Sequence, residues 1–231
     1  MGILRYTASA DNTITNAFNY TLETRGSGSN MGYADSLEIF SIYGQASSST
    51  AGRSEELSRA LIQFPTARIS ADRTANRLPA SGNVSFYLKM SNAETPFTLP
   101  QDFTLTVAPV SRSWTEGTGL DMDEYKDLGY SNWMSASSTT AWTSVGTFDN
   151  YGFGIHLTAS DEAYHSSSTG ENNGPVIHNV VGSTDSYYTK KFFARSSEYF
   201  FKRPVIEARW DSRIQDDREN FMFSSSLAPA A

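Results

Sequence analysis

The chain has 231 residues, and its 25 acidic and 18 basic side chains give a formal charge of -7 at pH 7. This acidic balance argues against a nucleic-acid surface, because affinity for nucleic acids comes largely from neutralising phosphates. The chain has no cysteine, which excludes disulfides and the common thiolate zinc sites. No apolar run approaches the ~18 residues that a membrane span requires, so we expect no membrane partner.

The composition favours short strands and turns over helices. The chain holds 16 glycines, 12 tyrosines and 14 phenylalanines, with many serines and threonines. A single domain of this length buries roughly 70% of its unfolded surface, so its core needs no disulfide or metal. The first twelve residues contain one arginine and no seven-residue apolar core, so they do not resemble a signal peptide. We therefore expect synthesis in a cytoplasm.

Alternating apolar residues predict a series of strands. In chain order, these cover residues 4–8, 12–14, 37–43, 59–64, 83–90, 103–110 and 153–158. The clearest is the fifth, where Val84, Phe86 and Leu88 share one face. Residues 45–54 are expected to form a polar loop and residues 69–77 one short helix or turn. Eight to ten strands at irregular spacing predict an antiparallel β-sandwich or jelly roll with long loops.

Residues 187–210 predict two closing strands, because aromatic side chains such as Tyr199, Phe200 and Phe201 favour extended backbone. The second strand follows Pro204 and is expected to enter beside partners already laid down, since a proline is tolerated at a strand's entry. The basic side chains of this stretch indicate a solvated strand face. These are Lys190, Lys191, Arg195, Lys202 and Arg203.

The sequence thus predicts a β-sandwich domain over residues 1–210 and an extended linker or arm over residues 211–231. The arm loses strand periodicity and ends in small residues, a composition typical of linkers. Segments of this kind commonly become ordered when they bind a neighbour. We expect Phe221, Met222 and Phe223 to be the apolar residues that bind a partner protein.

Residues 113–141 run without periodicity, and loops of this length in compact domains are usually functional or held by their own contacts. Trp114, Trp133 and Trp142 are the expected anchors. Tyr33, Tyr125, Tyr130 and Trp133 fall in loops and are candidates for stacking on sugar rings or for burial in a protein partner. Alternatively, each of these aromatic rings packs under its own loop.

Carboxylates in the same region suggest two further sites. Asp121, Asp123 and Asp127 have spacings that resemble a calcium loop, but the glycine and glutamate positions that complete an EF-hand are missing. The run is therefore either a solvated loop or a calcium site completed from elsewhere, and we expect no other cofactor. Glu116 is a candidate general acid, but glycoside cleavage needs a second carboxylate about 5–10 Å away, which the sequence does not place.

Other catalytic and metal-binding signals are weak. The three histidines have no metal-ligand spacing, and the serine-rich stretches contain no nucleophile elbow. Asn30 and Asp35 form a second oxygen-rich pair that is more typical of turn chemistry than of metal binding. We therefore expect a protein without enzymatic activity.

Several motifs follow one another in an order that resembles the DNRLRE-type β-sandwich, a carbohydrate-binding-like jelly roll. They are ADNTI at 10–14, NMGYADSLEI at 30–39, RALIQF at 59–64, VSFYLKM at 84–90, VAPVSRSWTEGTG at 107–119 and FFARSSEYFFKRPVIEARW at 192–210. Longer stretches, such as DFTLTVAPVSRSW, resemble virion structural proteins of marine tailed bacteriophages. The chain departs from the family between residues 142 and 152, where relatives have a further strand and a short amphipathic helix.

The resemblance implies a non-enzymatic virion protein that decorates a capsid, belongs to a neck or tail, or forms part of a fibre. Such a protein would dock on other virion proteins through its loops and C-terminal arm, and we expect a homo-oligomer, with a trimer favoured. The alternative is a polysaccharide-binding module that uses loop aromatics. A third reading, a degradative enzyme acting on acidic polysaccharides, would depend on Glu116.

Overall fold

The computed structural model describes residues 1–18, 25–48, 52–80, 82–94, 105–120, 129–142, 150–157 and 186–212. These segments form mostly antiparallel strands, with one short α-helix among the described residues. The expected all-β, sandwich-like fold is therefore confirmed, whereas jelly-roll connectivity stays a prediction. No helix in these segments is both long and apolar enough to cross a bilayer.

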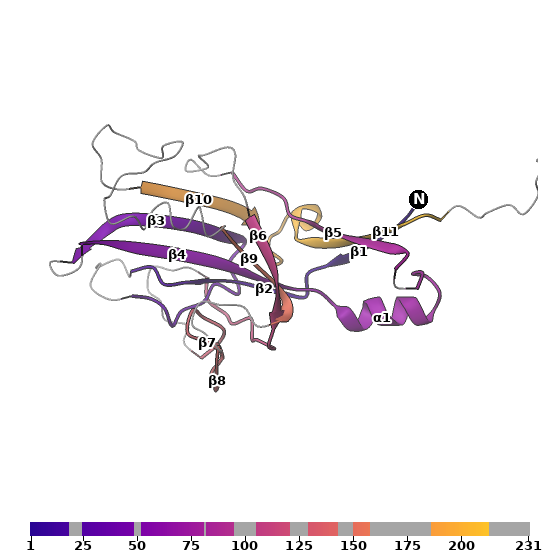
Figure 1. Ribbon diagram of the computed structural model, residues 1–231, viewed down its shortest axis with the longest axis horizontal. Coiled ribbons are helices and arrows are strands. Elements are labelled where there is room, and N and C mark those ends of the chain that lie inside the picture. The colour runs from indigo at the N-terminus through magenta and orange to yellow at the C-terminus, as the bar shows by residue number, and fades with distance from the viewer. Residues whose placement is uncertain are drawn as a thin grey trace, which may run out of the picture.

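The larger sheet has the strand order β10-β3-β4-β9-β6, and β2 also pairs with β4. Its strands are β2 (Ala10–Thr15), β3 (Ser36–Ser48), β4 (Gly52–Gln63), β6 (Leu105–Ser111), β9 (Asn150–Leu157) and β10 (Ser186–Phe193). The first half of β4 pairs with β3, and its second half pairs with β2. The long β3 and β4 run side by side along the sheet (Figure 1).

Two hydroxyl groups satisfy the backbone where β3 separates from β4. Ser58 Oγ accepts a hydrogen bond from Phe40 N at 2.8 Å and donates one to Glu38 O at 2.7 Å. Thr13 Oγ1 accepts a hydrogen bond from Glu38 N at 3.1 Å. Because buried backbone groups need partners, these two side chains allow β2 to fill the space between the diverging strands.

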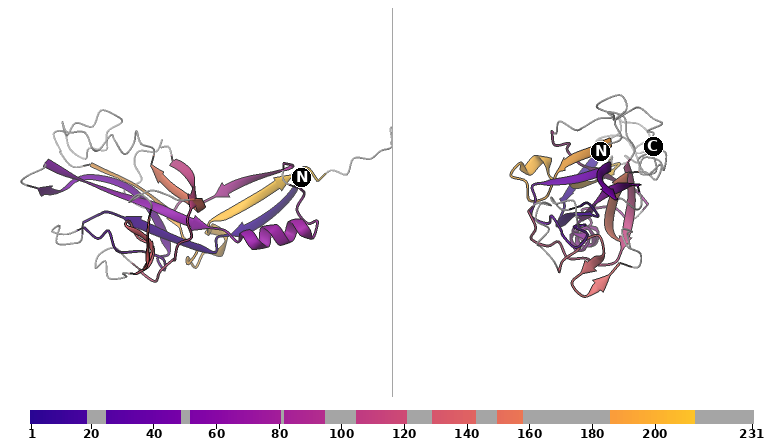
Figure 2. Two further views of the ribbon diagram at one scale, coloured as in Figure 1. Left: turned by 60° about the horizontal axis from the view of Figure 1, so that its bottom comes forward. Right: turned by 90° about the vertical axis from the view of Figure 1, so that its left-hand side faces the viewer.

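The smaller sheet has the order β1-β11-β5 and consists of β1 (Gly2–Thr7), β11 (Val205–Trp210) and β5 (Val84–Lys89). As expected, the last strand enters late, between partners from the first 90 residues, with Pro204 just before it. The α-helix α1 (Thr66–Thr74) lies along one face of this sheet, and Tyr6 Oη donates a hydrogen bond to its Asp72 at 2.9 Å. The smaller sheet and α1 extend away from the larger sheet (Figures 1 and 2).

Two hydrophobic clusters hold these layers together. The first joins the sheets, since it contains Tyr6 and Ile206 from the smaller sheet and Leu37 and Ile62 from the larger. The second packs under the long aperiodic region. It contains Ile14, Leu57, Leu61 and Val110, together with Trp114, Trp133, Ala136 and Trp142. All three tryptophans are buried, which confirms the prediction that they anchor this region.

Two expectations about loops need correction. The predicted polar loop over residues 45–54 is largely strand, because β3 continues to Ser48 and β4 begins at Gly52. The aperiodic region also contains a small hairpin formed by β7 (Ser135–Ser137) and β8 (Thr140–Ala141). Both segments are rich in serine and threonine, so hydrophobic alternation, the signal that reveals half-buried strands, is missing from them.

Candidate functional site

Asp11, Glu116 and Arg195 meet in a polar joint between three distant segments. Arg195 Nε and Nη2 donate to the two carboxylate oxygens of Glu116, at 2.9 and 2.7 Å. Glu116 Oε1 also accepts a hydrogen bond from Asp11 N at 2.8 Å. In return, Arg195 N donates to Asp11 Oδ2 at 2.5 Å. The joint therefore links the start of β2, the loop after Trp114 and the segment that follows β10.

Tight loop contacts surround this joint. Asn30 Oδ1 accepts hydrogen bonds from Gly32 N at 3.2 Å and from Gly119 N at 3.0 Å. A Cβ at Gly32 would overlap the backbone of Glu116, and a Cβ at Gly117 would overlap the Asn30 side chain. Gly117 also has a φ of +85°, which disfavours residues with side chains. Asn30 therefore serves turn and loop contacts, as its residue type indicated.

The polar joint contains two carboxyl groups, Asp11 and Glu116, but only one of them is paired with the Arg195 guanidinium. Burial raises the pKa of Asp11 to about 7, although the hydrogen bond from Arg195 N opposes the rise; nearby Glu116 adds to it. Asp11 Oδ1 is buried and has no hydrogen-bond partner among the described residues. The guanidinium of Arg195 donates through Nε and Nη2 to Glu116, whereas Asp11 accepts a hydrogen bond from the backbone N of Arg195. Asp11 is consequently the carboxyl group that favours its neutral form.

This geometry bears on the candidate general acid. Both oxygens of Glu116 are engaged by Arg195, and Glu116 also holds the backbone of Asp11. A general acid must instead present its carboxyl group to the leaving oxygen of a substrate. In the structure, Glu116 instead links its own loop to Asp11 at the start of β2 and to Arg195 after β10.

A second polar cluster lies on the smaller sheet, where Glu207 of β11 is surrounded by three cations. Its oxygens contact Arg5 Nε at 2.8 Å, Lys89 Nζ at 3.3 Å and Arg209 Nε at 2.5 Å. The hydrogen bonds from Arg5 and Arg209 lower the pKa of Glu207 to about 2. Sequence reasoning missed this cluster, because only the strand register brings Arg5 of β1 opposite Glu207.

A shallow hollow of about 510 Å³ opens beside this cluster. Its lining residues are Met1, Ser85, Tyr87, Arg209, Trp210 and Asp211. The Arg209 guanidinium lies 4.6 Å from the centre of the Tyr87 ring, and Tyr87 is exposed. The hollow thus combines an aromatic face with polar and charged groups, a combination that can orient a small ligand.

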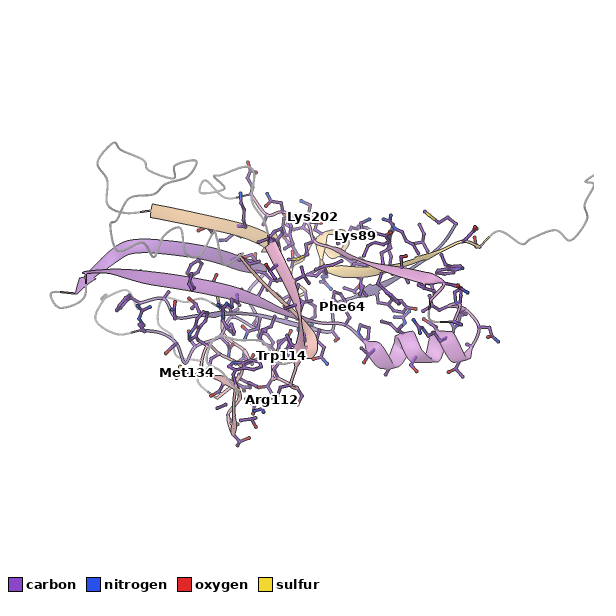
Figure 3. All side chains as sticks on the ribbon, viewed as in Figure 1. Phe64, Lys89, Arg112, Trp114, Met134 and Lys202 are labelled. Atoms are coloured by element: carbon purple, nitrogen blue, oxygen red, sulfur yellow. The ribbon has the colours of Figure 1, made fainter. Side chains whose placement is uncertain are left out.

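Among the described residues, the two most exposed aromatic side chains, Phe200 and Phe201, belong to an aromatic turn. This turn is defined here as residues Tyr199–Arg203 and includes the 3-10 helix η1 (Phe200–Lys202). Tyr199 is 52%, Phe200 58% and Phe201 95% exposed. The turn projects from the side of the molecule (Figure 2, right), and Lys202 lies where the two sheets meet (Figure 3). The prediction that these aromatics form a strand is wrong, because hydrogen bonds such as Lys202 N to Tyr199 O at 2.8 Å close a turn before Pro204.

The predicted glycan-binding residues differ in how exposed their side chains are. Tyr130 is partly exposed, but Trp133 is only 9% exposed. The Trp133 ring lies 4.7 Å from the Arg59 guanidinium carbon, so it offers no open face for a sugar and instead packs within its own region. Among the described residues, no group of three histidine, aspartate or glutamate side chains is placed to hold a metal ion.

The remaining predicted site residues lie outside the described part of the chain. They are the glycan candidate Tyr125, the calcium candidates Asp121, Asp123 and Asp127, and the partner-binding residues Phe221, Met222 and Phe223. Comparison of the chain with protein-family models, curated proteins and solved structures found no match in any of the three. The described features that bear on function are therefore the aromatic turn, the polar joint and the hollow.

Proposed function

We propose that this chain is a non-enzymatic structural protein of a tailed-bacteriophage virion and that it works by docking onto other proteins. The observation that carries the proposal is the aromatic turn, in which Phe201 is 95% exposed beside Tyr199 and Phe200. Single exposed apolar residues are common on protein surfaces. Three consecutive aromatic residues on one turn instead form the kind of patch that marks an interaction site.

The aromatic turn has the chemistry of a protein-binding surface. Interfaces are enriched in tyrosine, phenylalanine and arginine, and a few buried aromatics commonly supply most of the binding energy. The Phe200 and Phe201 rings meet edge to face at 5.5 Å. The Arg203 guanidinium lies 5.4 Å from the Phe200 ring, and Lys202 Nζ lies 4.9 Å from the Tyr199 ring. A partner would therefore meet an aromatic surface edged by positive charge.

The turn is also held rigidly, which lowers the entropy cost of binding. Its base contains Arg195, which is fixed by Glu116, and the buried Ser197. Arg203 Nε donates a hydrogen bond to Ser197 O at 2.8 Å, and Ser196 Oγ donates one to Ala34 O. The polar joint thus supports docking by positioning the aromatic turn, without taking part in any chemistry.

The assignment to a virion depends on the sequence resemblance, and the predicted arm residues Phe221, Met222 and Phe223 would supply a second contact. The proposal is tested by purifying particles from cells that produce the tagged chain and measuring its copy number by mass spectrometry. We expect the wild-type chain in the particles, and the Phe200→Ser/Phe201→Ser double variant in strongly reduced amount. A Tyr87→Ser variant, altered at an exposed aromatic elsewhere, is the matched control. Absence of the wild-type chain from particles would overturn the proposal.

The hollow favours a second candidate function, the binding of a polysaccharide. Tyr87 offers a ring for stacking, while Ser85 and Arg209 offer polar groups beside it. This site differs from the loop aromatics that the sequence suggested. A glycan array probed with the wild-type chain and with Tyr87→Ala tests it, with Tyr130→Ala as the comparison. Retention that depends on Tyr130 alone, or no retention of any glycan, would count against the hollow.

A further inference from the structure

We propose that the aromatic turn binds an acidic and apolar surface of a different protein of the particle, with Lys202 and Arg203 pairing with carboxylates of that partner. The proposal rests on the proposed function and deepens it, because it states the chemistry of the surface on which the turn docks. It is carried by the two cations of the turn, for which the described part of the chain supplies no carboxylate.

Lys202 is held over aromatic rings and forms no ion pair with any described residue. Its side chain is exposed, and its Nζ lies 4.6 Å from the centre of the Phe193 ring and 4.9 Å from that of the Tyr199 ring. These two rings meet edge to face at 5.5 Å. Glu198 is the acidic residue nearest to the turn in the sequence, and it is exposed and does not pair with Lys202. The ammonium group is therefore positioned by the rings and open to an anion from outside.

Arg203 presents a forked donor. Its Nε donates a hydrogen bond to Ser197 O at 2.8 Å, and its guanidinium carbon lies 5.4 Å from the centre of the Phe200 ring. Within the described segments, no group accepts a hydrogen bond from its two Nη atoms. A guanidinium fork matches the two oxygens of a carboxylate, so this pair of Nη atoms can still hold one by two parallel hydrogen bonds.

Other basic side chains of the same stretch are already paired. Lys191 Nζ lies 2.5 Å from Glu38 Oε1, and Arg195 Nη2 lies 2.7 Å from Glu116 Oε2. The cluster of basic residues that the sequence shows thus divides into members that hold the fold together and the two cations of the turn, which do not. Because the latter are fixed beside exposed rings, charge and apolar surface are presented to the same partner.

The aromatic rings supply the apolar part of the contact. Phe201 is 95% exposed, and buried aromatic residues are among those that most often dominate the binding energy of an interface. Complementary charges beside them select the partner and speed the encounter. The partner surface therefore needs an apolar recess for Phe201 with carboxylates at its rim.

A second copy of the chain fits this requirement less well than a different protein does. Two turns that face each other would bring like charges together. In the described segments of a second copy, most carboxylates are buried or already paired with a cation, namely Asp11, Glu38, Glu56, Asp72, Glu116 and Glu207. We therefore assign the acidic surface to a different protein.

Carbodiimide cross-linking of purified particles tests the proposal, because it joins an amine to a carboxylate in direct contact without a spacer. We expect mass spectrometry to find Lys202 linked to an aspartate or glutamate of another particle protein. Lys202→Arg is the matched control: it keeps the positive charge and should be incorporated as the wild type is, but its guanidinium does not form the amide. The Lys191–Glu38 pair should cross-link in the isolated chain and in particles alike, which shows that the reagent works.

Charge reversal gives an independent readout. Lys202→Glu should lower the copy number in particles at least about fivefold, because it places a carboxylate against the acidic surface of the partner. Arg68→Glu changes the net charge equally at an exposed residue of α1 and should leave the copy number unchanged. Both side chains are exposed, so neither variant should alter the circular dichroism spectrum. Raised salt should release the wild-type chain more readily than it releases an uncharged contact, since rim charges are screened.

Several results would overturn the inference. A wild-type chain that is present in particles but has no Lys202 cross-link, or a Lys202→Glu chain incorporated as the wild type is, would do so while leaving the proposed function intact. Cross-links from Lys202 to a second copy of this chain would assign the turn to self-association instead. Flotation of the chain with phosphatidylglycerol vesicles that is lost in Lys202→Glu, without a cross-link in particles, would replace the protein partner by a lipid surface. Absence of the wild-type chain from particles would overturn both the inference and the proposed function.

Discussion

Arg195 donates hydrogen bonds from Nε and Nη2 to the two carboxylate oxygens of Glu116, a residue 79 positions away in the sequence. This pair joins the segment that carries the aromatic turn to the loop that carries Leu120. A substitution that breaks this pair is therefore expected to shift the position of the aromatic turn. The same pair holds both carboxylate oxygens of the residue that the sequence suggested as a candidate general acid.

Glu116→Gln should lower the free energy of unfolding by about 2 kcal/mol, because it leaves the partly buried Arg195 without its charged partner. Denaturant unfolding monitored by fluorescence measures the change. Arg77→Gln is the control, since the Arg77 side chain of the Arg77–Asp72 pair is 70% exposed, and such pairs contribute about 0–1 kcal/mol. Turnover of an acidic polysaccharide that is lost with Glu116→Gln would instead support the enzyme reading.

Asp11→Asn should make the protein more stable at pH 8. The pKa of Asp11 is about 7 in the folded chain, against the ordinary aspartate value of 3.8. Between these two pH values the folded state therefore binds more protons than the unfolded state. The stability that Asp11 contributes is fully present below pH 3.8 and is lost as the pH rises through 7. We expect a gain of about 1–3 kcal/mol at pH 8 for Asp11→Asn, an order-of-magnitude value, and a flatter pH profile. The exposed Asp35 supplies the control, Asp35→Asn; identical profiles for Asp11→Asn and the wild type would contradict the burial argument.

Glu207→Gln should have the opposite pH signature. Arg5 and Arg209 hold the folded pKa of Glu207 at about 2, below the ordinary glutamate value of 4.5. Its contribution is therefore present above pH 4.5 and is lost as the pH falls toward 2. Thermal unfolding followed from pH 7 to acid should show a smaller acid-induced loss for the variant than for the wild type. Equal losses would mean that the three cations do not stabilise the carboxylate in the folded chain.

Gly117→Ala should destabilise the protein more than Gly82→Ala. Both glycines have positive φ, +85° and +108°, so alanine is strained at each. Only at Gly117 would the added Cβ meet another group, the Asn30 side chain, because nothing lies within 4 Å of it at Gly82. We expect the free energy of unfolding to fall by about 1 kcal/mol for Gly82→Ala and by more for Gly117→Ala. Chemical denaturation measures both changes. Equal losses would show that Asn30 can move away.

The sequence predicts those features of the fold that depend on local pattern. The alternation of Val84, Phe86 and Leu88 is sufficient for β5, and large apolar side chains in an aperiodic region identify tryptophans such as Trp114 as anchors. Features that depend on the register between paired strands cannot be predicted from local pattern. Arg5 and Glu207 become neighbours only when β1 pairs with β11.

In the aromatic turn, strand propensity alone predicts the wrong backbone conformation. Tyr199, Phe200 and Phe201 favour strands as residue types, but hydrogen bonds within the turn and the anchored Ser197 fix another conformation. Exposure is a tertiary property, so the sequence could not reveal that Phe201 points into solvent. Likewise, Trp133 and Tyr130 are similar as loop aromatics in the sequence, yet only Tyr130 reaches the surface.

The central claim is that the aromatic turn becomes covered when the chain assembles, and the absence of cysteine allows a direct measurement of this. A single thiol introduced at the exposed Glu198, as Glu198→Cys, leaves the aromatic side chains and both cations of the turn intact. Ser85→Cys on β5 reports on a surface outside the turn. The reaction rate of each thiol with a maleimide is compared between the isolated chain at low concentration and the chain in purified particles. We predict strong protection at position 198 and little at position 85; equal reactivity at position 198 in both states would contradict the account.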